Sequence, residues 1–334
     1  MTRRQFVNDP QDHVREGLAG FELANARLVR WNRDPSYVVR ATPARASKVG
    51  LLSGGGSGHE PLHTGFVGEG MLDAAVPGAI FSSPTVEQVE AATRAVDAGA
   101  GVLHIVKNYT GDKLNFSIAA ELVADDGIEV ATVVVADDLA TDSDDPGLPG
   151  RRGTAAVVTV EKVCGAAAER GASLAELKAL GERVADGSRS MALALAAPAH
   201  PGEGQPSFEL LDGEVEFGVG IHGERGIGRT SFASADELAA SLTTPVADAL
   251  DLVAGDEVIA IVNGLGATHP IELNVVFGAA AGVLERRGVE VARALVGPYV
   301  TALDMAGCSV TLTRADAEIL DLWDAPVRTP GLTW

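Results

Sequence analysis

Three short segments combine glycine with side chains that can bind or react with a small polar molecule. The first, SGGGSGH at 53–59, has four glycines within six residues. Such a backbone can approach a ligand closely and offer amide N–H groups to oxygen atoms. A tight turn between a strand and a helix is the alternative interpretation. Neither a Walker A sequence nor the GxGxxG order is present, so no nucleotide site is predicted.

The second segment, KNYTGD at 107–112, follows the apolar run Val102–Val106. A lysine, an asparagine and an aspartate gathered at the end of a strand can bind a polyhydroxylated ligand, with Asp112 able to accept a proton from a hydroxyl group. On spacing alone, the favoured interpretation of Asp112 is a cap for a helix predicted to begin near Leu114.

The third segment, GVGIHGERG at 218–226, places His222 between glycines, where its ring is sterically open. A solvent-exposed imidazole is largely neutral at pH 7 and can act as a nucleophile, a base or a metal ligand. A loop histidine without a role is the alternative. His59 and His63 are four residues apart, but Pro61 between them disfavours a metal-binding helix, and we predict no metal site.

Short β-branched runs alternate with alanine-rich amphipathic stretches, which predicts an α/β fold. In the first half we expect strands at Lys48–Leu52, Gly101–Val106 and Glu129–Val135, with helices at Thr85–Ala98 and Leu114–Asp125. Ligands of open α/β sheets bind beyond the carboxyl ends of the strands. The glycine cluster, expected where the first strand ends, and the segment after Val106 are therefore the first candidate site.

The stretch Asp137–Gly153 is rich in Asp, Gly and Pro and predicts a surface loop. Helices are expected at Arg152–Glu169 and Ser173–Val184, then a strand at Met191–Ala196. We place a domain boundary near residue 185, giving domains 1–185 and 186–334. In the second domain the patterns predict strands at Glu214–Ile221, Glu257–Val262, Val289–Val296 and Ser309–Thr313, and helices at Asp236–Leu242, Ile271–Arg287 and Arg314–Trp323.

The charge balance excludes two classes of partner. The 334 residues carry 46 Asp and Glu against 26 Lys and Arg, a net charge of -20, which disfavours nucleic acids and anionic membranes. Two cysteines far apart do not suggest a disulfide framework. The basic N-terminus is not followed by an apolar region like that of a signal peptide, and no apolar run is long enough to span a membrane. We expect a soluble, cytoplasmic protein.

Taken together, the motifs resemble the dihydroxyacetone-binding subunit of the dihydroxyacetone (glycerone) kinase family. The similarity extends from about Phe6 to Leu320 and includes SGGGSGHEP at 53–61, GFVGEGMLDAAVPGAIFSSPT at 65–85, VKNYTGDKLNF at 106–116, GIHGERG at 220–226, NGLGATHPIEL at 263–273 and TALDMAG at 301–307. The resemblance implies two α/β domains with mixed or parallel sheets flanked by helices, of the DAK1/DegV-like type.

The resemblance also implies a mechanism. Nε2 of His222 would add to the carbonyl group of dihydroxyacetone and form a covalent hemiaminal, which selects ketones and aldehydes over glycerol. The substrate hydroxyls would be held by Gly56, Ser57, Gly58, His59, Lys107 and Asp112. Asp112 would deprotonate the hydroxyl that receives the phosphoryl group, with His59 as a proton-transfer or hydrogen-bonding partner. Arg225 stands where many members carry proline.

The family resemblance accounts for the missing nucleotide loop. It implies that ADP or ATP with Mg²⁺ is held by an L-type partner subunit, a separate polypeptide since this chain ends at Trp334, and that a phosphotransferase-system phosphocarrier fed from phosphoenolpyruvate recharges it. It implies a homodimer as well. Two alternatives remain: a kinase subunit for a four-carbon ketose such as erythrulose, and a ketose-sensing regulatory coactivator. The donor pathway, phosphoenolpyruvate or direct ATP, stays open.

Overall fold

The structure, a computed structural model, describes residues 4–143, 145, 147, 149–202 and 205–334. Residues 144, 146 and 148 of the predicted loop 137–153, and residues 1–3 of the basic N-terminus, lie outside them. The chain forms two compact units, and it passes from one to the other after residues 6, 135, 156, 183 and 320. Separate domains at 1–185 and 186–334 remain a prediction. Among the described residues, no helix has the length and apolar character needed to cross a membrane.

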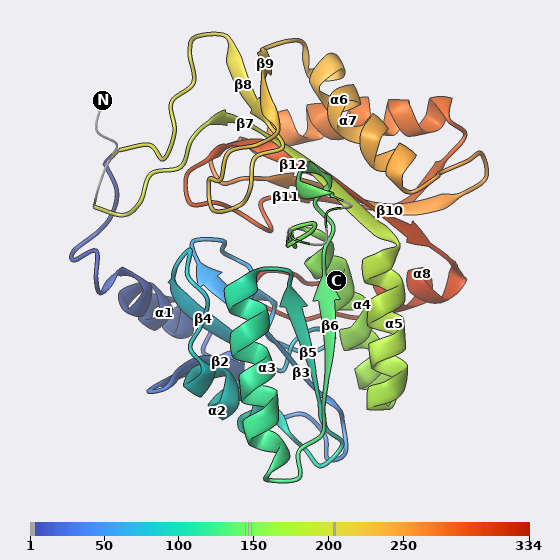
Figure 1. The fold of residues 1–334 in the computed structure, drawn as a ribbon. Helices are drawn as coiled ribbons and strands as arrows, with labels where there is room; N and C mark the ends of the chain where they lie inside the picture. The colour runs from blue at the N-terminus through green and yellow to red at the C-terminus, as the bar shows by residue number, and fades with distance from the viewer. Residues whose placement is uncertain (1–3, 144, 146, 148, 203–204) are drawn as a thin grey trace. The chain divides into compact units, whose positions relative to one another are not determined.

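The Lys107 unit, so named for its central lysine, comprises residues 7–135, 157–183 and 321–334. Its six-stranded sheet has the order β1-β2-β4-β3-β5-β6, in which β4, β3, β5 and β6 run parallel (Figure 1). The strands are β1 (Val29–Arg33), β2 (Ser36–Arg40), β3 (Gly50–Ser57), β4 (Ala74–Ile80), β5 (Val102–Lys107) and β6 (Val130–Val135). The helices are α1 (His13–Ala24), the short η1 (Thr64–Phe66), α2 (Val86–Val96), α3 (Thr110–Ala124), α4 (Ala156–Arg170) and α5 (Leu174–Asp186).

Helices α2 and α3 cover one face of this sheet, where Leu52, Val76, Val89 and Phe116 belong to a buried apolar core. Successive residues of a strand point to opposite faces. Since Leu52 and Val106 face this core, their neighbours Ser53 and Lys107 point to the opposite face. The face of the sheet opposite α2 and α3 therefore carries the polar side chains of Ser53 and Lys107 toward the carboxyl ends of β3 and β5.

One prediction about β3 was wrong. The strand was expected to end at Leu52, but it continues through the glycine run to Ser57. A Cβ on Gly54 would lie 2.7 Å from the carbonyl oxygen of Val76, and one on Gly56 would lie 2.6 Å from the backbone nitrogen of Ser82. The glycines are thus needed inside the sheet, because neighbouring backbone approaches them too closely for a side chain.

The His222 unit comprises residues 1–6, 136–156 and 184–320. Its six-stranded sheet is mixed, in the order β11-β10-β12-β7-β8-β9. The strands are β7 (Ser188–Ala196), β8 (Glu214–Phe217), β9 (Gly228–Ser231), β10 (Glu257–Gly264), β11 (Glu290–Gly297) and β12 (Ala306–Ala315); the helices are η2 (Leu139–Thr141), α6 (Ala235–Ala249) and α7 (Pro270–Arg286). A further helix, α8 (Ala317–Asp324), is divided between the two units.

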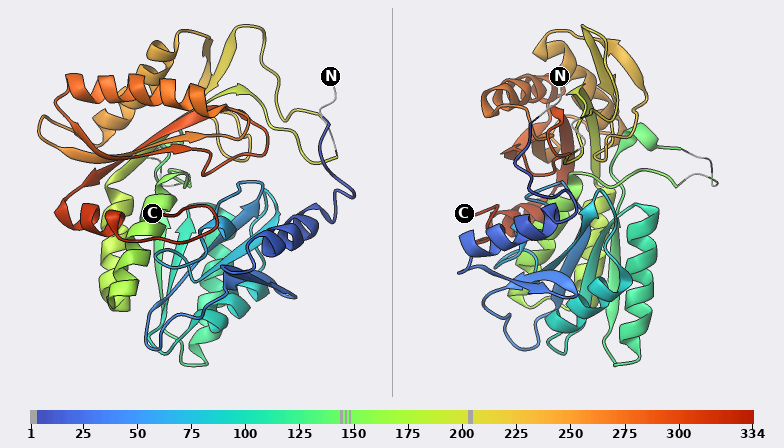
Figure 2. Two further views of the ribbon diagram at one scale, coloured as in Figure 1. Left: turned by 180° about the vertical axis from the view of Figure 1, so that it is seen from behind. Right: turned by 90° about the vertical axis from the view of Figure 1, so that its left-hand side faces the viewer.

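Helices α6 and α7 lie side by side on one face of this sheet (Figure 2). Leu193, Leu242, Leu284 and Val310 contribute to the apolar core beneath them. The other face carries polar pairs across β7 and β12, with Ser190 Oγ 2.6 Å from Thr311 Oγ1 and Ser188 Oγ 2.8 Å from Thr313 Oγ1. The predicted α/β class is confirmed.

Several element boundaries differ from the predictions. The alternating stretch Glu214–Ile221 is a strand only over β8, and the remainder is loop. Helix α6 continues past the predicted Leu242 and through Pro245 to Ala249. Helix α8 starts at Ala317 rather than at Arg314, because Arg314 is still part of β12. The patterns did not identify α1, β1, β2, β4 or β9.

Candidate active-site residues

In the Lys107 unit, Lys107 is the last residue of β5 and Asp112 lies in the first turn of α3. Both side chains are buried, at 1% and 4% exposure. The interpretation of Asp112 as a helix cap was wrong, because α3 begins at Thr110 and follows Tyr109 as its N-cap. Asp112 is instead inside the helix, where a carboxylate is favoured by the helix dipole.

Gly55 provides the space in which these two side chains lie. A Cβ atom on Gly55 would be 2.4 Å from Nζ of Lys107 and 3.7 Å from Oδ2 of Asp112. The Lys107 ammonium group also donates to the carbonyl oxygen of Gly54 at 3.3 Å. A buried cation and a buried carboxylate therefore meet against bare backbone, an arrangement suited to a small ligand with hydroxyl groups.

The other predicted ligand-binding residues follow in the same stretch. Ser57 donates its hydroxyl to the carbonyl oxygen of Gly78 at 2.7 Å, and Gly58 has a φ of 101°, which favours glycine. His59 is fully buried and stacks on Phe81 with ring centroids 5.1 Å apart. Gly56 lies against the backbone of 81–82. All six predicted residues of the Lys107 unit are thus at the carboxyl ends of β3 and β5 or just beyond.

Sequence reasoning missed three residues that contact this group. Nδ1 of His63 lies 2.6 Å from Oε1 of Glu161 on α4 and 3.0 Å from Oγ of Ser53 on β3, while its Nε2 lies 2.8 Å from Nζ of Lys107. His63, Glu161 and Ser53 are all buried. His63 had been considered only as a metal ligand. Glu161 has no local signal except that it is a charged residue in the apolar stretch AVVTVEKV of α4.

Burial shifts the protonation of this cluster. It lowers the pKa of His63 well below its usual 6.5, and the charge of Lys107 lowers it further. Burial also lowers the pKa of Lys107, although the carboxylates of Asp112 and Glu161 act in the opposite direction. The pKa of Glu161 is raised by burial to about 8, against the opposing effect of the Lys107 charge. His63 is therefore neutral, and Glu161 ionises only in alkaline solution.

In the His222 unit, His222 lies in the loop between β8 and β9 and its side chain is 20% exposed. Its Nδ1 is 2.9 Å from Oε1 of Glu224, and its backbone N–H donates to Oε2 of the same carboxylate at 2.9 Å. A Cβ on Gly220 would lie 1.9 Å from Oε2 of Glu224, so only glycine allows this approach. The His-Gly-Glu sequence thus folds back on itself to hold the imidazole.

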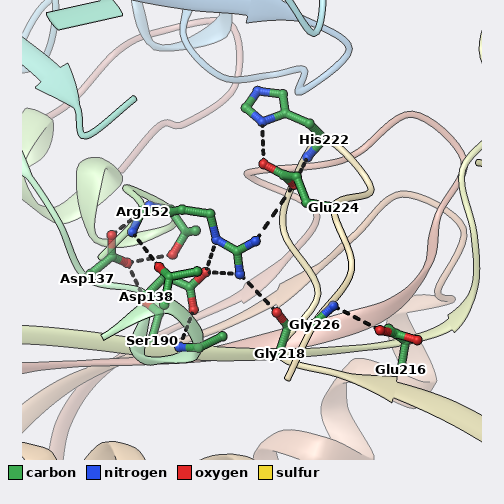
Figure 3. A network of polar contacts seen from close by, with 12 residues as sticks. Asp137, Asp138, Arg152, Ser190, Glu216, Gly218, His222, Glu224 and Gly226 are labelled. Atoms are coloured by element: carbon green, nitrogen blue, oxygen red, sulfur yellow. Dashed lines mark hydrogen bonds and ion pairs between the residues drawn. The ribbon is translucent and has the colours of Figure 1, made fainter. Parts of the chain in front are cut away.

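Figure 3 shows that Glu224 lies between His222 and Arg152. Arg152 reaches the Glu224 carboxylate at 4.0 Å, donates to the carbonyl oxygen of Gly218 at 2.9 Å and donates through Nε to Asp138 at 2.8 Å. Burial would raise the pKa of Glu224, but its contacts with His222 and the charge of Arg152 outweigh this and lower it to about 2. Glu224 is therefore ionised throughout the neutral range.

Two consecutive aspartates connect this loop to the sheet (Figure 3). Asp137 accepts the backbone N–H groups of Thr154 and Ala156 at 2.6 and 3.0 Å, and the hydroxyl of Ser190 on β7. Burial raises the pKa of Asp138 to about 6, although the charge of Arg152 opposes the shift. The predicted surface loop therefore contains buried ionic contacts that position Arg152.

Within the residues that the structure describes, no group of three or more His, Cys, Asp or Glu side chains is arranged to hold a metal ion. The neighbours of His63 are a lysine, a serine and one carboxylate. Arg225 is exposed on the loop that carries His222.

Comparison with known proteins agrees with the sequence resemblance. Residues 19–331 match the Dak1 domain. The chain is 45% identical over 355 residues to the PEP-dependent dihydroxyacetone kinase, dihydroxyacetone-binding subunit DhaK, of Escherichia coli (strain K12), covering 99% of both chains.

Solved structures give the same result. The fold is similar to the dihydroxyacetone kinase operon co-activator Dha-DhaQ, with a TM-score of 0.89 and 32% identity over 94% of this chain and 97% of that one. It is also similar to the dihydroxyacetone kinase of C. freundii, with a TM-score of 0.88 and 34% identity over all of this chain and 60% of that one. The predicted family is confirmed: the chain belongs to the Dak1 domain family.

Proposed function

We propose that this protein is the dihydroxyacetone-binding subunit of a dihydroxyacetone kinase. The observation that carries the proposal is its 45% identity, over 99% of both chains, to a subunit so named. The presence of His222, Asp112, Lys107 and His59 supports catalysis, because each of the side chains that the family resemblance requires is in place.

His222 is the proposed nucleophile. When Nδ1–H donates to the ionised Glu224, the lone pair of the ring is on Nε2. Nε2 attacks the carbonyl carbon of dihydroxyacetone, the carbonyl electron pair moves to oxygen, and that oxygen takes up a proton to become a hydroxyl. The ring is then positively charged, and the Glu224 carboxylate stabilises this charge. The hemiaminal forms only with a carbonyl compound, so glycerol is excluded.

The Lys107 unit is proposed to bind the substrate hydroxyls and move the proton. Asp112 accepts the proton of the terminal hydroxyl, Lys107 stabilises the resulting negative charge, and His59 takes part in hydrogen bonding or proton transfer. Gly56, Ser57 and Gly58 contribute backbone and hydroxyl groups. The proposal assigns these residues and His222 to one substrate molecule, and a crystal structure of the adduct tests that assignment.

The phosphoryl group is proposed to come from a separate L-type subunit that holds ADP or ATP with Mg²⁺ and is recharged by a phosphocarrier from phosphoenolpyruvate. The product is dihydroxyacetone phosphate. The name of the E. coli relative supports this donor. We further propose a homodimer located in the cytoplasm. Supplying phosphoenolpyruvate with the phosphocarrier, or ATP alone, to the two-subunit mixture identifies the donor, and sedimentation measures the oligomeric state.

The covalent step can be tested without the partner subunit. With [2-¹³C]dihydroxyacetone, we expect the carbonyl resonance to be replaced by that of a tetrahedral carbon on the protein. His222→Ala should abolish this signal, and His200→Ala, a histidine change elsewhere in the same unit, should retain it. An adduct that survives in His222→Ala refutes the assignment of the nucleophile. Parallel assays with erythrulose decide whether a four-carbon ketose is the better substrate.

A regulatory function is the second candidate, because the fold is equally similar to the co-activator Dha-DhaQ. Under this alternative the protein binds a ketose and does not turn it over. Failure of the wild-type protein to support phosphorylation of any short ketose, with a partner subunit that is active on a known kinase, would favour it.

A further inference from the structure

A buried histidine and a buried glutamate lie behind Lys107. His63 contacts Lys107 through Nε2 at 2.8 Å and Glu161 through Nδ1 at 2.6 Å, so its ring connects the two charged groups. Glu161 is fully buried, and its Oε2 atom has no hydrogen-bond partner among the described residues. Burying a carboxyl group with one oxygen unsatisfied costs free energy, which suggests a purpose beyond packing.

Ser53 determines which nitrogen of His63 carries the proton. The Ser53 hydroxyl donates to the carbonyl oxygen of Ile105 at 2.7 Å, so its oxygen faces Nδ1, 3.0 Å away, as an acceptor. Once the Glu161 carboxyl group is ionised, its Oε1 is a second acceptor for the same nitrogen. Two acceptors at Nδ1 favour the Nδ1–H tautomer, which leaves the lone pair on Nε2 to accept from Lys107.

Lys107 is therefore surrounded by groups that match an ammonium ion. The Gly54 carbonyl oxygen on β3 and Nε2 of His63 accept its protons, while the carboxylates of Asp112 on α3 and Glu161 on α4 act on its charge. His59 lies close enough to His63 to affect its protonation. Burial without these groups would favour the neutral amine, which cannot stabilise a developing negative charge.

We propose that Ser53, His63 and Glu161 form a positioning network for Lys107, in which Ser53 and Glu161 fix the His63 tautomer and His63 holds the Lys107 ammonium group against Gly54 and Gly55. The role of Lys107 toward substrate rests on the proposed function. The network itself does not, because it concerns contacts among this protein's own side chains.

The test uses the whole chain labelled with [¹⁵N]lysine, without substrate or partner. The chain has only five lysines, at 48, 107, 113, 162 and 178, so the Nζ signals can be assigned by substitution. In Glu161→Gln, which removes the negative charge, we expect the titration midpoint of Lys107 to fall by about one pH unit, at the lower end of what a nearby opposite charge contributes. Glu169→Gln, the same change farther along α4 where Glu169 pairs with Arg40, should leave the midpoint unchanged.

An unchanged Lys107 midpoint in folded Glu161→Gln overturns the proposal. A second measurement needs no variant: ¹⁵N spectra of the histidine rings above pH 8, where Glu161 is ionised, should show His63 as the Nδ1–H tautomer, and the Nε2–H tautomer would refute the network. Activity then gives a separate result. If Lys107 acts on substrate, the pH at which kcat falls in alkaline solution should decrease in Glu161→Gln by the same amount as the Lys107 midpoint. A shifted midpoint with an unmoved profile refutes the role of Lys107 and leaves the network intact.

Discussion

The carboxylate of Glu224 contacts His222 twice, through Oε1 at 2.9 Å from the ring Nδ1 and through Oε2, which accepts the backbone N–H of His222 at 2.9 Å. One side chain two residues away thus fixes both the tautomer and the backbone of the proposed nucleophile. Its contacts with His222 lower the pKa of Glu224, and the charge of Arg152, which belongs to a distant part of the sequence, lowers it further.

Glu224→Gln should weaken the adduct with dihydroxyacetone. The amide keeps a similar shape but no longer stabilises the positive charge that develops on the ring. Hydrogen bonds to charged groups contribute about 1.5 to 3 kcal/mol, so we expect the adduct constant and kcat/KM to fall roughly 10- to 100-fold. Titration with [2-¹³C]dihydroxyacetone measures the constant. Glu214→Gln, a change in the neighbouring strand β8, serves as the control, and equal adduct constants in all three proteins would contradict this account.

Gly55→Ala should displace Lys107. The added methyl carbon would lie 2.4 Å from Nζ, and the end of the lysine side chain can move more easily than the strand. We expect a folded protein whose activity is reduced about 100-fold, since small misplacements of catalytic groups have effects of that order. Steady-state kinetics and a thermal melt test this. Gly20→Ala, where a Cβ meets nothing within 4 Å, should keep full activity; normal activity in Gly55→Ala would show that the Lys107 position is not critical.

Arg152→Ala should destabilise the His222 loop. The change leaves the buried Asp138 without its cation and Gly218 without a hydrogen bond to its carbonyl oxygen. Removing one partner of a buried ion pair costs about 3 kcal/mol or more. Urea unfolding measures the loss, and limited proteolysis should cut within 218–227. Arg151→Ala, which loses a more exposed contact with Asp142, is the matched control. The prediction fails if both variants unfold at the same urea concentration.

The stability of the protein should depend on pH through Glu161. Its pKa is raised from 4.5 to about 8 in the folded state, so the folded protein binds the proton more tightly than the unfolded chain. The corresponding stabilisation is complete below pH 4.5 and is lost as the pH rises to about 8. We expect the free energy of unfolding to decrease less between pH 5 and 8 in Glu161→Gln than in the wild-type protein. Parallel curves for the two proteins would exclude a raised pKa at this residue.

The sequence was informative where a signal is local. The α/β class follows from the alternation of apolar runs, and Lys107 and Asp112 could be named as candidate ligand-binding residues because they follow a clear apolar strand. The glycine run was singled out as a candidate site, but its conformation was not predicted. Glycine usually breaks a strand, and only the close approach of Val76 and Phe81, which belong to other segments, explains why these glycines lie at the end of β3.

The contacts of His63, Glu161 and Arg152 could not be predicted, since each joins segments far apart in the chain. Glu161 is 98 residues from its partner His63, and Arg152 is 66 residues from Gly218. A charged residue inside an apolar helix was the one available signal for Glu161. For Arg152, the surrounding Asp, Gly and Pro residues predicted an exposed loop. In the structure, Asp137 and Asp138 of this segment are buried, and Arg152 donates to Asp138.

The interleaving of the two units limits how the gene can be divided. A fragment ending near residue 185 would contain Asp137 and Arg152 but neither Ser190 nor Gly218, to which they are hydrogen bonded. The complementary fragment would lack residues 136–156 of its own compact unit. A division near residue 185 therefore separates hydrogen-bonding partners of one compact unit, and producing that unit alone calls for a rearranged chain order in which linkers replace the excised segments.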